Sequence, residues 1–305
     1  MCRLLFLALG FATILIGNSC VGKNTNEEVY KVRLGFLKND NERPVFVELE
    51  HFDSLENSIQ TIKYLQDGTI WEVYNSLYDS GGRLQEYDVR GGKYKLYYSG
   101  TGNIISKVFE NQNGSQTFSY KYNKRGLLVS RIISSQDEFF LNSIEKYFYN
   151  NSDSIISIKQ FSIPGNKPFS KDSIVFRGNK KIIYSFSGSN YDGIVPDELS
   201  ILEYSRGKLV LIRSYKKSFN GLELYLNFVK RYRYKDELLI EIIEKGFPIS
   251  SFCGVGDSRI KYRKSIFTTV ADRKLINYSR FIDEVKFSEK DFDFPSKIYY
   301  PFNIN

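Results

Sequence analysis

Apolar and polar residues alternate one by one over short segments of this chain, and turn-forming residues separate these segments. The segments 93–97 and 119–122 are two examples. A two-residue period is typical of half-buried β-strands, because successive side chains point to opposite faces of a sheet. The sequence contains no convincing helical period of apolar residues. This pattern predicts an all-β protein.

A turn motif recurs between the predicted strands and reads Tyr-x-x-x-Gly-x-Leu or Ile. Clear copies begin at Tyr64, Tyr78, Tyr98 and Tyr122, and the copy at 149–155 carries Asp153 in place of glycine. The motif predicts a hairpin: the aromatic residue closes one strand, Asp or Asn starts the turn, Gly takes a positive φ, and Leu or Ile opens the return strand. The turn residues predicted in this way are Tyr64, Gly68, Tyr78, Asp79, Gly82, Leu84, Tyr98, Gly102, Tyr122, Asn123, Gly126, Leu128 and Gly207.

Shortened copies continue the motif towards the C-terminus. The segment 204–209 lacks one residue, and Phe176, Tyr234 and Tyr262 begin segments that are recognised by their spacing. From Tyr78 onward each interval holds two strands and two turns. We therefore expect one β-repeat domain, 29–305, that forms an antiparallel meander. Its extended, twisted sheet is expected either to curl on itself or to fold into two layers.

The composition agrees with a sheet. Aromatic residues make up 16% of the chain, and alanine, the best helix former, occurs after the leader only at Ala271. The net charge is +8 and its basic residues are spread along the chain. Even the basic segment 230–235 alternates with Tyr232 and Tyr234, which predicts a solvated strand face and no nucleic-acid partner.

The first residues indicate export. Arg3 precedes an uncharged apolar run, 4–16, which is shorter than the roughly 20 residues that cross a bilayer as a helix, so a cleaved signal peptide, 1–19, is expected. The segment 16–20 resembles the lipobox of bacterial lipoproteins, which implies acylation of Cys20 and a membrane partner through this lipid anchor. Gly17 replaces the usual Leu, so ordinary cleavage after Ser19 stays an alternative. The polar segment 20–28 predicts a flexible tether.

The turn motif resembles the YD-repeat (RHS-type) family, whose units read Tyr-x-Tyr-Asp-x-x-Gly-Arg-Leu. The best matches are 77–84 and 120–128, and the likeness extends over about residues 60–270. Large members of that family wind many repeats into a shell around a toxin, whereas this chain has too few units for one. The resemblance implies strand-turn-strand geometry and supplies no activity. Together with the leader, it implies a lipoprotein of a Gram-negative cell envelope, expected at the outer membrane, with its periplasmic or surface face left open.

The residues that could carry chemistry are few. His51 is the single histidine, and it cannot build a multi-histidine metal site. Cys253 is interpreted as a small buried side chain, and a dyad with His51 is the weaker alternative. The loop 254–258 lacks the lysine of a phosphate-binding loop, and the segment 150–154 lacks a full set of calcium ligands. No metal and no cofactor is therefore expected.

Two function classes remain open. The first is a non-catalytic binding or scaffold module for an envelope glycan or another envelope protein, because rows of Tyr on a sheet can stack on an extended polymer and hydrogen-bond to it. The second is a hydrolase of an envelope polysaccharide that uses two facing carboxylates. No catalytic residue is assigned, and the candidate acids for the second class are Glu48, Glu50, Asp53, Asp192 and Glu198.

Overall fold

The computed structural model describes residues 30–39, 43–65, 67–136, 142–193, 195–217, 223–247, 261–270 and 297–299. The predicted signal peptide and tether, Cys20, Cys253 and the loop 254–258 therefore lie outside the described residues. Apart from one 3-10 turn, η1 (Gly188–Asn190), the regular elements of the described residues are all strands. They are β1 (Tyr30–Asn39), β2 (Val45–Phe52), β3 (Ser58–Tyr64), β4 (Ile70–Tyr78), β5 (Leu84–Val89), β6 (Gly92–Tyr98), β7 (Ile104–Asn111), β8 (Gly114–Tyr122), β9 (Leu128–Ser135), β10 (Ser143–Tyr149), β11 (Ile155–Ser162), β12 (Pro168–Arg177), β13 (Lys180–Ser187), β14 (Glu198–Ser205), β15 (Lys208–Lys217), β16 (Glu223–Lys235), β17 (Leu238–Gly246), β18 (Lys261–Val270) and β19 (Lys297–Tyr299).

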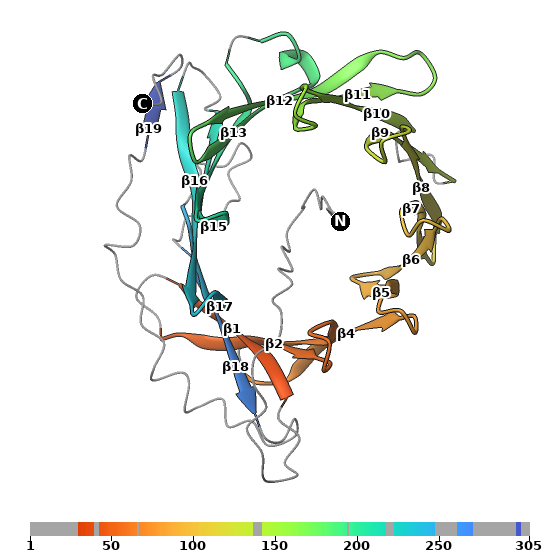
Figure 1. Cartoon of the computed structure of the whole chain (residues 1–305). Coiled ribbons are helices and arrows are strands. Elements are labelled where there is room, and N and C mark those ends of the chain that lie inside the picture. Colours follow the sequence, from red (N-terminus) through yellow and green to blue (C-terminus); the bar gives the residue numbers. More distant parts are fainter. Residues whose placement is uncertain are drawn as a thin grey trace.

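The strands form a closed antiparallel barrel (Figure 1). Each strand from β1 to β17 pairs with the next one in sequence, which confirms the predicted all-β meander. β1 and β18 then pair along their whole length, from Tyr30 opposite Val270 to Asn39 opposite Lys261. The short β19 pairs with the start of β16. The expectation of an extended, twisted or curled open sheet is therefore wrong, because closure pairs the two edges that such a sheet would expose.

The turn motif folds into one repeated geometry. At 78–84, the Asp79 carboxylate accepts hydrogen bonds from the backbone N–H groups of Gly81 and Arg83 at 2.9 and 2.8 Å. Gly82 has a φ of 76°, and Tyr78 lies opposite Leu84 across the turn. The turns at 122–128 and 149–155 repeat these bonds through their Asn side chains. Side-chain bonds and one left-handed residue thus define the turn.

The observed turns differ from the predicted ones in three places. The segment 52–58 is a further copy, in which Asp53 bonds the N–H groups of the two residues Leu55 and Asn57, and Glu56 has a φ of 63°. The Tyr64 turn joins β3 to β4, so it lies at the opposite rim from the turns that follow Tyr78 and Tyr98. The prediction that a turn segment begins at Tyr262 is wrong, because this residue is buried within strand β18.

The late copies use a tighter connection. Arg206 and Gly207 link β14 to β15 with φ values of 49° and 77°, and Asp236 and Glu237 link β16 to β17 with 47° and 71°. Two successive positive φ angles define a two-residue type I′ hairpin. This change of turn type is the reason why the motif shortens towards the C-terminus.

Tyrosine hydroxyls connect successive hairpins. The Tyr98 hydroxyl donates to the Leu84 carbonyl at 2.5 Å, and Tyr122 donates to the Ile104 carbonyl at 2.8 Å. Each acceptor belongs to the residue that opens the return strand of the preceding turn. The same bond recurs from Tyr78 to Ser58, from Tyr149 to Leu128 and from Tyr234 to Leu209.

The two faces of the barrel wall differ in burial around the ring. One face, here called the tyrosine face, carries Tyr87, Tyr94 and Phe109 and the side chains that the strand register places on the same side of the sheet. The opposite face holds the buried hydrophobic clusters of β13–β18 and of β1 and β2. On β4, however, the opposite face exposes Trp71 and Leu77 by 49% and 57%. From β5 to β10, side chains of mixed polarity on the tyrosine face are partly covered.

Candidate functional site

Four aromatic rings form a cluster on the tyrosine face of β5 to β8. Strand register places Tyr87 opposite Tyr94 and Tyr94 opposite Phe109. The rings of Tyr87 and Tyr94 are stacked with centroids 5.0 Å apart, and Tyr94 lies 5.0 Å from Phe109 and 6.2 Å from Phe118. Such offset and tilted contacts are favourable arrangements for aromatic pairs. We call Tyr87, Tyr94, Phe109 and Phe118 the aromatic cluster.

Gly92 makes room for one of these rings. A Cβ atom built on Gly92 would lie 2.2 Å from the Glu110 carbonyl oxygen and 2.8 Å from a ring carbon of Phe109. The ring therefore rests against bare backbone, which is a recognised reason for glycine inside a strand. The position of Phe109, and with it the shape of the cluster, depends on this missing side chain.

Lys107 lies among the rings of the aromatic cluster. Its Nζ atom is 3.7 Å from the Tyr94 centroid, 5.3 Å from that of Tyr87 and 5.7 Å from that of Phe118. An ammonium group over aromatic faces is attracted by their negative electrostatic potential. Within the described residues Lys107 forms no ion pair, and burial, followed by the charge of Arg131, lowers its pKa to about 8.

The neighbouring cation is paired. Arg131 contacts the Glu145 carboxylate at 2.5 Å, and the Tyr147 hydroxyl donates to the same carboxylate at 2.7 Å. The guanidinium also lies 5.7 Å from the Phe118 ring. Burial raises the pKa of Tyr147, with Glu145 adding to the effect, so this hydroxyl stays protonated. At this place on the tyrosine face, Arg131 is therefore paired with a carboxylate, whereas the neighbouring Lys107 is not.

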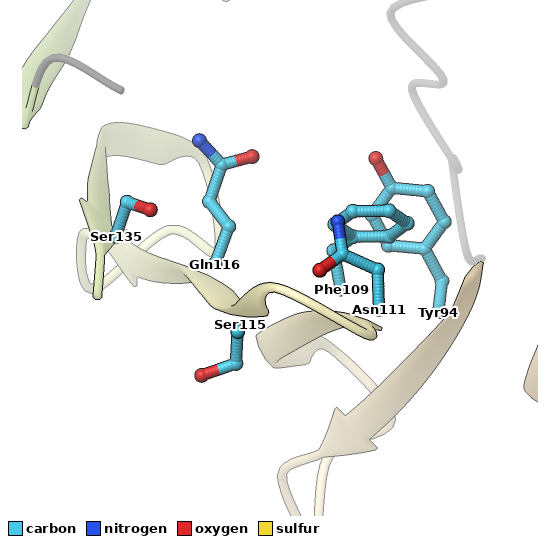
Figure 2. A pocket seen from close by; sticks show the side chains of 7 residues that line it. Tyr94, Phe109, Asn111, Ser115, Gln116 and Ser135 are labelled. Carbon is cyan, nitrogen blue, oxygen red and sulfur yellow. The ribbon is translucent and has the colours of Figure 1, made fainter. Parts of the chain in front are cut away.

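An open pocket of about 190 Å³ adjoins the aromatic cluster (Figure 2). Figure 2 shows the rings of Tyr94 and Phe109 close together on one side and Gln116 and Ser135 on the other. Register places Phe109 opposite Gln116, and Gln116 opposite Ser135. The pocket is smaller than the roughly 300–1,000 Å³ of drug-sized sites, and it suits one ring-sized unit of a ligand. Its lining consists of Tyr94, Phe109, Asn111, Gly114, Ser115, Gln116 and Ser135.

The acids considered for hydrolysis have structural partners. Glu48 and Glu50 both bind Arg33, the latter at 2.5 Å. Asp53 caps the 52–58 turn as described above. Glu198 accepts a hydrogen bond from Ser214 at 2.9 Å, and the remaining candidate, Asp192, is exposed in the loop that follows η1. The structure therefore brings only Glu48 and Glu50 side by side, and both face one shared cation.

The other residues considered for chemistry are placed as follows. His51 is buried on β2, and Cys253 lies outside the described residues. Among the residues that the structure describes, three or more His, Cys, Asp or Glu side chains do not gather into a group that could hold a metal ion. In the same part of the chain, every helix is too short or too polar to cross a membrane.

The predicted repeat residues and the pocket occupy different places. The structure puts the motif residues at the hairpin ends, for example Tyr122, Asn123 and Gly126 between β8 and β9. The pocket lies away from these turn positions, and its lining residues were not singled out from the sequence. Each lining residue looks like an ordinary strand or turn residue, and only the register of β6 to β9 brings them together.

Comparison with known proteins finds similarity to solved structures, at low sequence identity. No protein-family model matches the sequence, and no curated protein matches it. Among solved structures, a porin-like protein from Bacteroides uniformis ATCC 8492 is 12% identical, with a TM-score of 0.43 over 79% of this chain and 96% of that chain. The structure of TcdB2-TccC3 without its hypervariable C-terminal region is 11% identical, with a TM-score of 0.26 over 77% of this chain. This chain spans only 16% of the length of that second structure.

Proposed function

We propose that this protein is a non-catalytic binding module of the bacterial cell envelope that holds a glycan in the pocket beside the aromatic cluster. The observation that carries the proposal is the composition of this pocket. Two aromatic rings, Tyr94 and Phe109, lie opposite amide and hydroxyl groups such as those of Gln116 and Ser135. A sugar ring offers both kinds of surface, since its C–H faces stack on aromatic rings and its hydroxyls bond to amides.

The size of the pocket favours a glycan over another envelope protein. A stable protein interface buries roughly 800 Å² on each partner, whereas this pocket has room for one ring-sized unit. A polymer can place one sugar in such a site and continue along the barrel wall. Glu48 and Glu50, the candidate acids that lie side by side, share Arg33 as their cation, and we therefore propose binding without turnover.

Binding can be tested with purified mature protein and a panel of envelope glycans, by calorimetry. We expect Tyr94→Ala to weaken binding by about tenfold or more, because stacking and apolar contact are lost. Tyr97→Ala is the matched control, since Tyr97 projects from the opposite face and is exposed. Equal losses in both variants, or release of shortened glycan products, would contradict the proposal.

Anchoring to the membrane is the second half of the proposal and rests on the leader and on the YD-like turns. We propose that the chain is a YD-repeat-like lipoprotein attached through acylated Cys20. Mass spectrometry of the mature N-terminus from native membranes tests this directly. A diacylated or triacylated Cys20 is expected, whereas an unmodified terminus would indicate a secreted or periplasmic protein without a lipid anchor.

A further inference from the structure

We infer that the pocket selects an anionic sugar, and that Lys107 is the group that binds its carboxylate or phosphate. This inference rests on the proposed glycan site and adds a ligand class to it. Lys107 occupies the same face and strand as Phe109, two residues away, so the two side chains are neighbours along β7. Lys107 lies beside the residues that line the pocket, since its Nζ atom is 3.7 Å from the centroid of the lining ring of Tyr94.

Lys107 differs from three other cations of the tyrosine face. Arg33 binds Glu48 and Glu50, Arg131 binds Glu145 at 2.5 Å, and Lys230 binds Glu244 at 2.8 Å. Lys107, in contrast, has three aromatic rings as its partners within the described residues. A partly buried cation without a counter-ion is costly, and an anionic ligand would supply the missing charge.

The surroundings of Lys107 also predict how binding depends on pH. The titratable groups that interact with Lys107 are Tyr87 on β5, Tyr94 on β6 and Arg131 on β9. Next to these lie Tyr120 on β8, which interacts with Tyr94 and Arg131, and Glu145 on β10, which is bonded to Arg131. Burial raises the pKa of each of these three tyrosines, so they stay neutral at neutral pH. Because burial lowers the pKa of Lys107 to about 8, its charge is lost just above neutrality.

The experiment compares three probes by calorimetry at pH 7: an oligogalacturonate, its methyl ester and a hexose 6-phosphate. The ester keeps the sugar rings and removes the charge, and the phosphate distinguishes a general anion site from a carboxylate site. We expect the oligogalacturonate, whose carboxylates are charged at pH 7, to bind about tenfold more tightly than its methyl ester. We also expect this preference to shrink as the pH rises above about 8.

Variants assign the preference to Lys107. Lys107→Met should bind the acid and the ester equally, while Lys107→Arg should keep the preference because the positive charge remains. Lys121→Met is the control, since Lys121 is exposed on the opposite face of β8. Circular dichroism at pH 7 verifies that each variant is folded.

The outcomes separate the two proposals. If acid and ester bind equally to the native protein, or if Lys107→Met keeps the preference, the assignment of Lys107 is overturned while glycan binding stands. If none of the three probes binds, and Tyr94→Ala changes nothing with any envelope glycan, both proposals are overturned.

Discussion

Lys107 sits in the barrel wall with ring faces around its ammonium group, in a position where a neutral side chain would pack at lower cost. The three rings come from β5, β6 and β8, and the nearest additional charge is the positive one of Arg131. Cation–π attraction offsets part of the desolvation of the ammonium, and no carboxylate in the described residues offsets the rest. A residue that lowers stability in this way is a candidate for function.

We predict that Lys107→Met raises the thermal stability of the protein at pH 7. The pKa of Lys107 is about 8 in the folded chain, below its ordinary value of 10.5. A lowered pKa means that the charged form of Lys107 destabilises the folded state. This destabilisation is absent above pH 10.5, where the lysine is neutral in both states, and is complete below about pH 8. The gain in melting temperature should therefore be largest below pH 8 and vanish near pH 10.5. A gain that is the same at every pH would refute the argument.

Gly92 is a second residue whose surroundings predict the effect of a substitution on stability. Gly92→Ala should lower the free energy of unfolding by about 1–3 kcal/mol, because the new methyl group would collide with the Glu110 carbonyl and the Phe109 ring. Gly100→Ala is the control, since a Cβ atom there meets nothing within 4 Å and its φ is not positive. Urea titrations of both variants measure the difference. An unchanged stability of Gly92→Ala would show that the Glu110 backbone and the Phe109 ring can both shift at little cost.

At the scale of the hairpin, local chemistry was readable from the sequence. Asp79 and Gly82 carry enough information for a turn, because the side-chain bonds and the positive φ involve neighbours in the chain. The copy at 52–58 was missed because Glu56 stands in the glycine position and Ser58 in that of Leu. Tyr262 shows the opposite error. It has the spacing of a turn tyrosine, but it lies within β18 and pairs with Lys245 on β17.

Tyr122 connects two successive hairpins through its hydroxyl group. Tyr122→Phe should lower the free energy of unfolding by about 0.5–1.5 kcal/mol, because the bond to the Ile104 carbonyl is lost while the ring remains. Tyr97→Phe serves as the comparison, since this residue is 49% exposed on the opposite face. Denaturation midpoints of the two variants decide the question, and equal midpoints would count against the connecting role.

The barrel as a whole could not be derived from the repeats. Each hairpin predicts its own strands, but closure depends on the pairing of β1 with β18, and that pairing joins the two ends of the described domain. The candidate site was equally hidden, because Lys107 reads as an ordinary strand residue until the register adds Tyr87, Tyr94 and Phe118. Sequence periodicity reports which face a residue occupies, and it does not report what lies beside it.

Arg33 gives the prediction for the closed ring. It lies on β1, binds Glu48 and Glu50 on β2, and donates to Ser265 on β18 at 3.1 Å. Its side chain is 9% exposed, so Arg33→Met would leave two carboxylates without their shared cation. We expect a loss of about 3–5 kcal/mol in the free energy of unfolding.

Lys95→Met is the matched comparison for Arg33. Its ion pair with Glu110 spans 2.8 Å, but the two side chains are 36% and 41% exposed. The loss there should stay within about 1 kcal/mol. A similar loss for both variants would mean that the Arg33 contacts add little to the junction of β1, β2 and β18.

Ring closure has a consequence for how the chain is made. During synthesis β1 emerges well before β18, the strand that completes its hydrogen bonding. Until then the nascent sheet has two free edges, and such edges recruit other chains. A ribosome that stops before residue 261 would release a sheet made of native hairpins that cannot close. Its two open borders would favour aggregation, so a late nonsense mutation should be as damaging as an early one.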